Sequence, residues 1–283
     1  MLCRPACLVN RIIETDKGGE PNMTLGFDCA TPLTATTAAA FKADGYEFVC
    51  RYLVPTGAKR LTKEEAERIS DSGLNIVSVF ETTADRALGG RTAGLQDGAT
   101  AAKVAADIGQ PDHTAIYFAV DFDAAANQME TVIAYIRGAA EATAAFLTGV
   151  YGSYSVIEAV KAAGACSRFW QTYAWSYGSK AESIHIFQYL NDIKVNGIGI
   201  DKNESYGNEG WWRTGTADQG GDEEMKLEQW QWKMLGDSLD GLYKSGAISD
   251  YTWAEKAYTG VLTQSELAWL NTIMFARGKG IKV

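Results

Sequence analysis

Short apolar runs rich in β-branched and aromatic residues alternate with helix-like stretches from Leu25 onward. The runs cover residues 25–30, 48–54, 75–82, 115–123, 147–153, 168–173, 185–190 and 197–203. Helical patterns lie between them at residues 34–44, 62–72, 94–108, 127–145 and 154–163, the second opened by the capping box Thr62 and Glu65. This alternation predicts repeated β-α units around a parallel sheet, and eight strands close a barrel. We therefore predict an α/β fold of the (β/α)8 TIM-barrel type.

The connections after the sixth and seventh runs are too short for full helices. A barrel confined to residues 24–213 is also close to the lower limit of length for this fold. We therefore expect a partly degenerate barrel.

The chain is expected to have further parts on both sides of the barrel. Residues 214–224 contain no large apolar side chain and read as a linker. Beyond it, residues 225–283 carry apolar positions at helical spacing and a capping box at Thr263 and Glu266, which predicts a small all-α module of about three helices. Residues 1–23 form either an ordinary disordered arm or a segment that precedes a native start at Met23.

Composition narrows the classes of partner. Hydrophobic residues make up 46% of the chain, which predicts a globular protein. A net charge of −9 disfavours nucleic acid, and the absence of a long apolar run disfavours a membrane span. The first residues lack the features of a signal peptide, so we expect synthesis in the cytoplasm. The five cysteines lack zinc-type spacing, and neither a cofactor nor a metal is predicted.

Acidic residues end several of the predicted strands, where the side chains of an α/β barrel carry out catalysis. These residues are Asp28, Glu81, Asp121, Asp123 and Asp201. Asp121 and Asp123 are two apart and are expected to share one face of a strand. Crowded carboxylates raise one another's pKa, so one can stay protonated as a general acid while another stays ionised. Glycoside hydrolysis needs that pair.

Other interpretations of the same acids stay open. They could cap helices or pair with Arg51 and Arg86, or they could bind a divalent cation. Sequence motifs of serine hydrolases, zinc proteases and phosphate-binding loops are absent. A Cys-His amidase would need Cys29 or Cys50 beside a histidine, but both cysteines lie in strand-like segments.

Five segments together resemble the lysozyme-like hydrolases of glycoside hydrolase family 25, and more closely its divergent bacteriolysin-like, glycoside-hydrolase-like branch from bacteria and phages. They lie at residues 26–28, 117–123, 149–152, 187–189 and 199–203, and the resemblance covers residues 25–212. It implies that Asp28, Asp121 and Asp201 are active-site aspartates. Asp123 falls where better-studied members carry a glutamate as general acid. Three alternatives follow. Asp123 acts as the general acid on a substrate that binds in a shifted position, or Glu81 is the general acid, or the barrel binds glycan without cutting it.

Aromatic and amide side chains near the same strand ends are candidate sugar contacts, because aromatic faces stack on sugar rings and amides hydrogen-bond to them. The candidates are Tyr52, Tyr117, Tyr151, Trp175, Gln188, Tyr189 and Asn203. Trp170 is expected in the core.

The predicted function is that of a peptidoglycan-directed glycoside hydrolase that resembles a muramidase and lyses the bacterial cell wall. We expect it to act at the cell wall after release from the cytoplasm. A non-catalytic glycan-binding barrel and a phage structural or assembly protein are the alternatives. Residues 225–283 could direct the protein to the wall, mediate self-association or form an inert cap.

Overall fold

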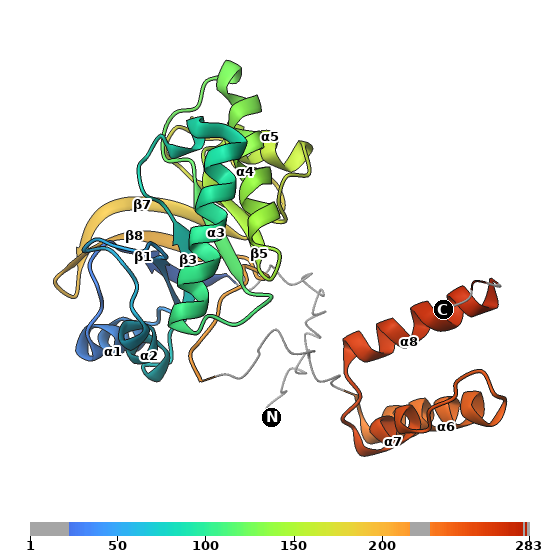
Figure 1. Cartoon of the computed structure of the whole chain (residues 1–283). Helices are drawn as coiled ribbons and strands as arrows, with labels where there is room; N and C mark the ends of the chain where they lie inside the picture. The colour runs from blue at the N-terminus through green and yellow to red at the C-terminus, as the bar shows by residue number, and fades with distance from the viewer. Residues whose placement is uncertain (1–22, 216–226, 280, 282–283) are drawn as a thin grey trace, which may run out of the picture.

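The computed structural model describes residues 23–215, 227–279 and 281, and its larger part is a closed barrel of eight strands joined in sequence order (Figure 1). The strands are β1 (Thr24–Asp28), β2 (Phe48–Tyr52), β3 (Asn75–Phe80), β4 (Ala115–Ala119), β5 (Leu147–Gly152), β6 (Arg168–Thr172), β7 (Ile186–Val195) and β8 (Ile198–Ser205). All eight predicted strands are present. The predicted α/β barrel with C-terminal helices is confirmed.

Helices follow each of the first five strands. They are α1 (Ala35–Ala43), α2 (Lys63–Asp71), α3 (Gly90–Ile108), α4 (Met129–Ala142) and α5 (Tyr154–Ala162), with short 3-10 turns at Arg86–Gly89 and Ala126–Gln128. Thr34, Thr62 and Ser153 begin α1, α2 and α5 by accepting a backbone N–H three residues on. Among the described residues no helix separates β6, β7 and β8, which matches the expected degeneracy.

One strand runs against the expected direction. β8 is antiparallel to both β7 and β1, so the prediction of an all-parallel sheet is wrong at this strand. Asn196 and Gly197 connect β7 to β8, and both have a positive φ, as a two-residue hairpin turn requires. The reversal also moves Asp201 from the predicted end of the strand to its middle, opposite Asp28 on β1.

The barrel interior is filled below its mouth. Tyr117, Trp170 and Phe48 are among the buried side chains that occupy it. A Cβ atom on Gly26 would lie 2.2 Å from the Phe48 ring, and one on Gly149 would lie 2.5 Å from the Tyr117 ring. These two glycines therefore make room for aromatic rings inside the barrel, and only the mouth is left open.

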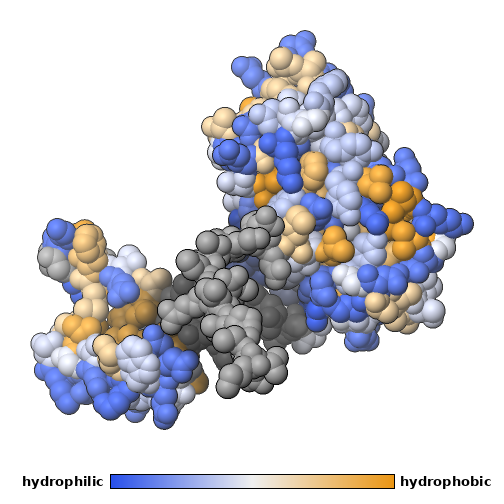
Figure 2. All heavy atoms as spheres, turned by 180° about the vertical axis from the view of Figure 1, so that it is seen from behind, coloured by the Kyte–Doolittle hydropathy of each residue, from blue (hydrophilic) through white to orange (hydrophobic). Residues whose placement is uncertain are grey.

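Helices α3, α4 and α5 pack side by side along one flank of the barrel (Figure 1). Figure 2 shows one face of the molecule, on which hydrophilic residues surround small hydrophobic patches. No helix in the described parts of the chain is long and apolar enough to cross a membrane.

The C-terminal residues form a helical module with a core of its own. Its helices are α6 (Gln229–Lys244), α7 (Thr252–Thr259) and α8 (Gln264–Gly278), and the predicted capping box of Thr263 and Glu266 opens α8. Leu239, Ile248 and Leu270 are buried in this core. The predicted N-terminal arm and most of the predicted linker lie outside the described residues.

Candidate active site

A cavity of about 230 Å³ opens at the mouth of the barrel. Side chains from every strand or from the loop that follows it contribute to its lining. They are Asp28, Tyr52, Val79, Glu81, Ala119, Asp121, Tyr151, Trp170, Ala174, Trp175, Gln188, Asn191 and Asp201. Four carboxylates therefore share one small space, which is the arrangement that acid-base chemistry on a glycan requires.

Asp28, at the end of β1, is the most buried of these acids, with 7% of its surface exposed. Its Oδ2 accepts hydrogen bonds from Gln188 Nε2 and Asn203 Nδ2, both at 2.8 Å. Tyr151 and Thr172 donate to Gln188 Oε1, so the orientation of that amide is fixed. The Asp28 carboxyl is thus held by neutral donors with no ion-pair partner among the described residues.

These surroundings decide the proton affinity of Asp28. Burial, followed by the charge of Asp201, raises its pKa to about 7, against the opposing effect of the hydrogen bonds from Asn203 and Gln188. A carboxylic acid of this kind holds a proton near neutral pH and can donate it.

Asp201 faces Asp28 from β8 and is bound from two sides. Its Oδ1 accepts the Asp192 backbone N–H at 2.8 Å, and its Oδ2 lies 3.3 Å from Gln188 Nε2. Asp192 has φ of +57° and lies in an irregular stretch of the β7–β8 pairing between Leu190 and Ile193. This irregularity turns the Asp192 N–H toward Asp201, as bulges beside active sites commonly do. Burial raises the pKa of Asp201.

Asp121 and Glu81 line the opposite side of the cavity. β4 ends at Ala119, so Asp121 lies in the loop beyond the strand rather than on it. Burial, followed by the charge of Glu81, raises the pKa of Asp121, and Lys59 acts against this increase. Glu81 follows β3, and its Oε1 lies 3.2 Å from Lys59 Nζ.

Asp123 is placed differently from the expectation. Because the strand ends four residues earlier, the argument that Asp121 and Asp123 share a strand face is wrong. The Asp123 side chain is exposed, does not line the cavity, and accepts a hydrogen bond of 2.7 Å from the Tyr177 hydroxyl. This contact joins the loop after β4 to the loop after β6 at the rim.

The candidate sugar contacts divide into two groups. Tyr52, Tyr151, Trp175 and Gln188 line the cavity. Tyr117, Asn203 and Tyr189 do not.

The two groups differ in how deep each residue lies along the barrel and in the direction of its side chain. Tyr117 is fully buried in the interior, where its hydroxyl donates to the Glu209 carbonyl. Asn203 is fully buried behind Asp28, and Trp170 donates to its Oδ1 at 2.8 Å. Trp170 itself, expected only in the core, also forms part of the cavity wall with 2% of its surface exposed.

Sequence reasoning missed Lys59 and Asn191. Lys59 lies in the loop between β2 and α2, away from the end of the strand, so the strand-end rule does not point to it. Asn191 lies in the irregular part of β7, which no local sequence signal marks. Its Oδ1 is buried and has no hydrogen-bond partner among the residues that the structure describes.

Within the described residues, no group of three or more His, Cys, Asp or Glu side chains is arranged to hold a metal ion. The carboxylates of the mouth are bound to amides and to Lys59 instead.

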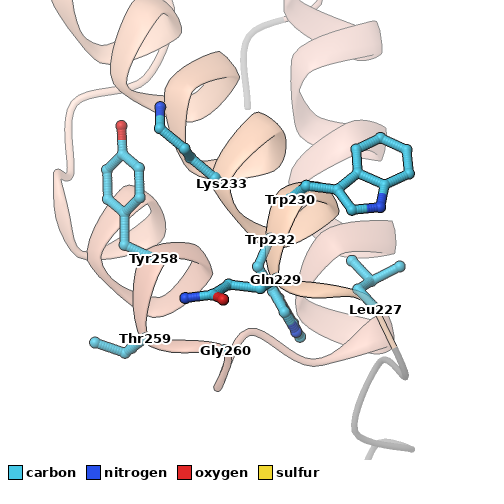
Figure 3. Close-up of a pocket in the computed structure, with 8 residues that line it drawn as sticks. All are labelled: Leu227, Gln229, Trp230, Trp232, Lys233, Tyr258, Thr259 and Gly260. Carbon is cyan, nitrogen blue, oxygen red and sulfur yellow. The ribbon is translucent and has the colours of Figure 1, made fainter.

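A second, larger hollow of about 710 Å³ lies in the C-terminal module (Figure 3). It is lined by Leu227, Gln229, Trp230, Trp232, Lys233, Tyr258, Thr259 and Gly260. None of these lining residues carries a carboxylate. Figure 3 shows Tyr258 and Lys233 facing one side of the hollow, with Trp230 pointing away from them.

The mouth of this α/β barrel, with its clustered carboxylates, is a site of the glycoside-hydrolase type. The chain belongs to the family described as "Rv2525c-like, glycoside hydrolase-like domain", which matches residues 39–205. The expected glycoside-hydrolase-like branch is thereby confirmed. The match begins after β1, so Asp28 precedes the matched residues.

Two relatives illustrate the family. The Mycobacterium tuberculosis protein named "Putative peptidoglycan hydrolase Rv2525c" is 30% identical over 184 residues, which cover 59% of this chain and 75% of that protein. FadG of Bacillus subtilis, an uncharacterized protein, is 34% identical over 145 residues, or 47% of this chain. The match covers only 24% of FadG.

Solved structures agree with the fold. The crystal structure of Rv2525c in complex with L-tartrate has a TM-score of 0.60 and 27% identity, covering 68% of this chain and all of that one. An uncharacterized B. stearothermophilus protein has a TM-score of 0.51 and 19% identity, covering 64% of this chain and 95% of that one. The second likeness is one of fold alone.

Proposed function

We propose that the barrel is a peptidoglycan-directed glycoside hydrolase, muramidase-like, which lyses bacterial cell walls. The observation that carries this proposal is the pair of contrasting acids in one cavity: Asp28, with a pKa of about 7, beside carboxylates that are more open to water. The name of the relative, "Putative peptidoglycan hydrolase Rv2525c", and the family description support the same activity. The enzyme acts at the wall of a bacterium after release from the cytoplasm, as an endolysin of bacterial or phage origin does.

Asp28 is the proton donor in this proposal. It protonates the glycosidic oxygen, and an ionised carboxylate from Asp121 or Asp201 stabilises the oxocarbenium ion or activates water. Tyr52 and Trp175 on the cavity wall supply rings on which a sugar can stack.

This assignment differs from the two acids suggested by the sequence. Asp123 is exposed at the rim, outside the cavity, and its carboxylate is already bound by Tyr177. Glu81 is held in an ion pair with Lys59, with 3.2 Å between Oε1 and Nζ. Asp28 has a neutral, buried environment instead.

Incubation of the purified chain with bacterial peptidoglycan tests the proposal. We expect falling turbidity together with new reducing ends, measured chemically, because a glycosidic bond leaves a reducing sugar. New free amino groups without reducing ends would indicate an amidase or peptidase. Binding to the wall without either product would support the alternative of a glycan-binding barrel.

For residues 225–283 we propose wall targeting. The hollow of Figure 3 combines an exposed Trp230, a Tyr258 ring and polar side chains, which is a lining that suits a saccharide. Lys233 forms an exposed ion pair with Asp237, so the net charge of this pair beside the hollow is close to zero and a neutral ligand is favoured. Self-association through the same module is the alternative, distinguished by whether the chain sediments as a monomer.

A further inference from the structure

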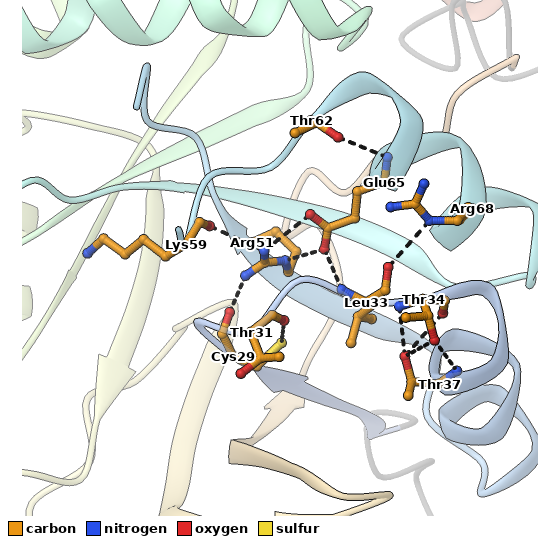
Figure 4. A network of polar contacts seen from close by, with 10 residues as sticks. All are labelled: Cys29, Thr31, Leu33, Thr34, Thr37, Arg51, Lys59, Thr62, Glu65 and Arg68. Carbon is orange, nitrogen blue, oxygen red and sulfur yellow. Dashed lines mark hydrogen bonds and ion pairs between the residues drawn. The ribbon is translucent and has the colours of Figure 1, made fainter. Parts of the chain in front are cut away.

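Lys59 is held at the mouth of the barrel by its own backbone. The Leu61 N–H donates to the Tyr52 carbonyl at 2.8 Å, which folds the loop after β2 back onto that strand. Arg51, fully buried, donates to the Lys59 carbonyl at 3.2 Å and to Glu65 on α2. Figure 4 shows this network, with the Lys59 side chain extending away from Arg51. The position of the lysine is thus fixed by the core and not by its exposed end.

The ammonium group of Lys59 meets two cavity residues from neighbouring strands. Its Nζ lies 3.2 Å from Glu81 Oε1 and 4.1 Å from the centroid of the Tyr52 ring. The Lys59 side chain is 29% exposed and that of Glu81 16% exposed. Water therefore screens this pair less than it screens an ion pair on an open surface.

The charges around Lys59 are strongly unbalanced. Asp28 on β1, Glu81 after β3, Asp121 after β4 and Asp201 on β8 all line the cavity, and Asp192 lies against Asp201. Within residues 23–215, Lys59 is the one lysine or arginine in an ion pair with a cavity carboxylate. One positive charge therefore faces a cluster of four acids.

We propose that Lys59 is a positioning residue of this site, whose ammonium group fixes the Glu81 carboxylate at the rim and counterbalances the acids of the cavity. This role rests on the proposed hydrolase function. It assigns Lys59 no contact with the reacting atoms. It sets the charge of the site and therefore the pH range in which the site works.

The sign of the effect follows from the charge of Lys59. A nearby positive charge favours the ionised form of a carboxyl group, and Lys59 lowers the pKa of Asp121. Removing that charge therefore raises the pKa of Asp121. The limb of the pH profile that reports the ionisation of Asp121 moves to higher pH, and the optimum rises with it.

Three variants of the full chain test the role. Lys59→Met removes the charge and keeps an unbranched side chain, Lys59→Arg keeps the charge, and Lys103→Met removes a charge from an exposed pair on α3. We expect the pH optimum of reducing-end release to rise by about 0.5 to 1 pH unit in Lys59→Met alone. An unchanged optimum in Lys59→Met, or an equal rise in Lys103→Met, would overturn the proposal.

A second measurement does not need activity. Carbon NMR titration of the carboxyl groups gives the pKa of Asp121 in each variant, and we expect a higher value in Lys59→Met than in the native chain. If the native chain releases no reducing ends at any pH, the hydrolase function fails, and this titration still decides the role of Lys59. Identical titration of Asp121 in both proteins would refute that role.

Discussion

The environment of Asp28 links its chemistry to the stability of the protein. The group is buried, faces the charge of Asp201 and receives only neutral hydrogen bonds from Gln188 and Asn203. Its pKa is about 7 when folded, against an ordinary value of 3.8. Between these values the folded protein holds a proton that the unfolded chain releases, so stability decreases as pH rises through this window.

Asp28→Asn should remove that contribution. The variant cannot ionise at this position. Its free energy of unfolding relative to that of the native protein should therefore be higher at pH 8 than at pH 4, by at most about 4 kcal/mol. Urea unfolding at both pH values measures the difference. An equal effect of the substitution at pH 4 and pH 8 would mean that Asp28 is ionised in the folded protein throughout.

The position of Asp123 predicts a mild effect of its substitution. Its carboxylate lies outside the cavity and is bound by the Tyr177 hydroxyl, so Asp123→Asn should lower turnover by no more than about threefold, the cost of one weakened hydrogen bond at the rim. Tyr177→Phe, which removes the other half of the contact, is the matched control. A loss of a hundredfold or more in Asp123→Asn alone would return Asp123 to the role of general acid.

At the scale of elements, the order of strands and helices was predictable because alternating apolar runs report local structure directly. The direction of β8 was not, because it depends on two residues, Asn196 and Gly197, whose positive φ allows a tight hairpin. The end of β4 was also misjudged. Val120 and Phe122 continue the apolar pattern beyond Ala119, although the pairing with β5 has already ended.

The buried ion pair of Arg51 and Glu65 ties three elements together. Glu65 on α2 accepts from Arg51 Nε at 2.8 Å and from the Leu33 N–H at 2.8 Å, and Arg51 also donates to the Cys29 carbonyl beside Asp28 (Figure 4). Both side chains of the pair are almost completely buried. The loops after β1 and β2 are therefore held at fixed positions below the mouth.

Glu65→Ala should destabilise the barrel strongly. It leaves the Arg51 guanidinium buried without its carboxylate, which costs about 3–5 kcal/mol in the free energy of unfolding. Glu64→Ala, one residue earlier on the exposed side of α2, should have a much smaller effect. Chemical denaturation compares the two, and equal losses would contradict the bracing role of Glu65.

At the scale of the whole molecule, the sequence predicted the cluster of acids more accurately than it predicted the aromatic rings that line the cavity. Asp28, Glu81 and Asp121 could be expected together because the fold brings the carboxyl ends of parallel strands to one rim, whereas Asp201 reaches the cavity from the middle of the antiparallel β8. The depth of Tyr117 and Asn203 inside the barrel depends on register and tilt, which single-strand patterns do not contain. Lys59 lies in a loop whose path is set by tertiary hydrogen bonds.

The barrel and the C-terminal module have separate apolar cores, which predicts that the barrel folds by itself. A chain of residues 23–215 should show a cooperative thermal transition and keep its activity on soluble glycan fragments. If residues 225–283 target the wall, the same chain should bind whole walls at least tenfold more weakly. A truncated barrel that is molten by circular dichroism would show that the module is needed for folding.

The central claim is that the carboxylates of the barrel mouth hydrolyse wall glycan with Asp28 as the acid. The most direct test compares the native chain with Asp28→Asn for both wall binding and reducing-end release near pH 6. The account predicts similar binding and a loss of release of at least a hundredfold, because the amide keeps the shape of the acid and cannot donate its proton. Reducing ends released at the native rate by Asp28→Asn would contradict it.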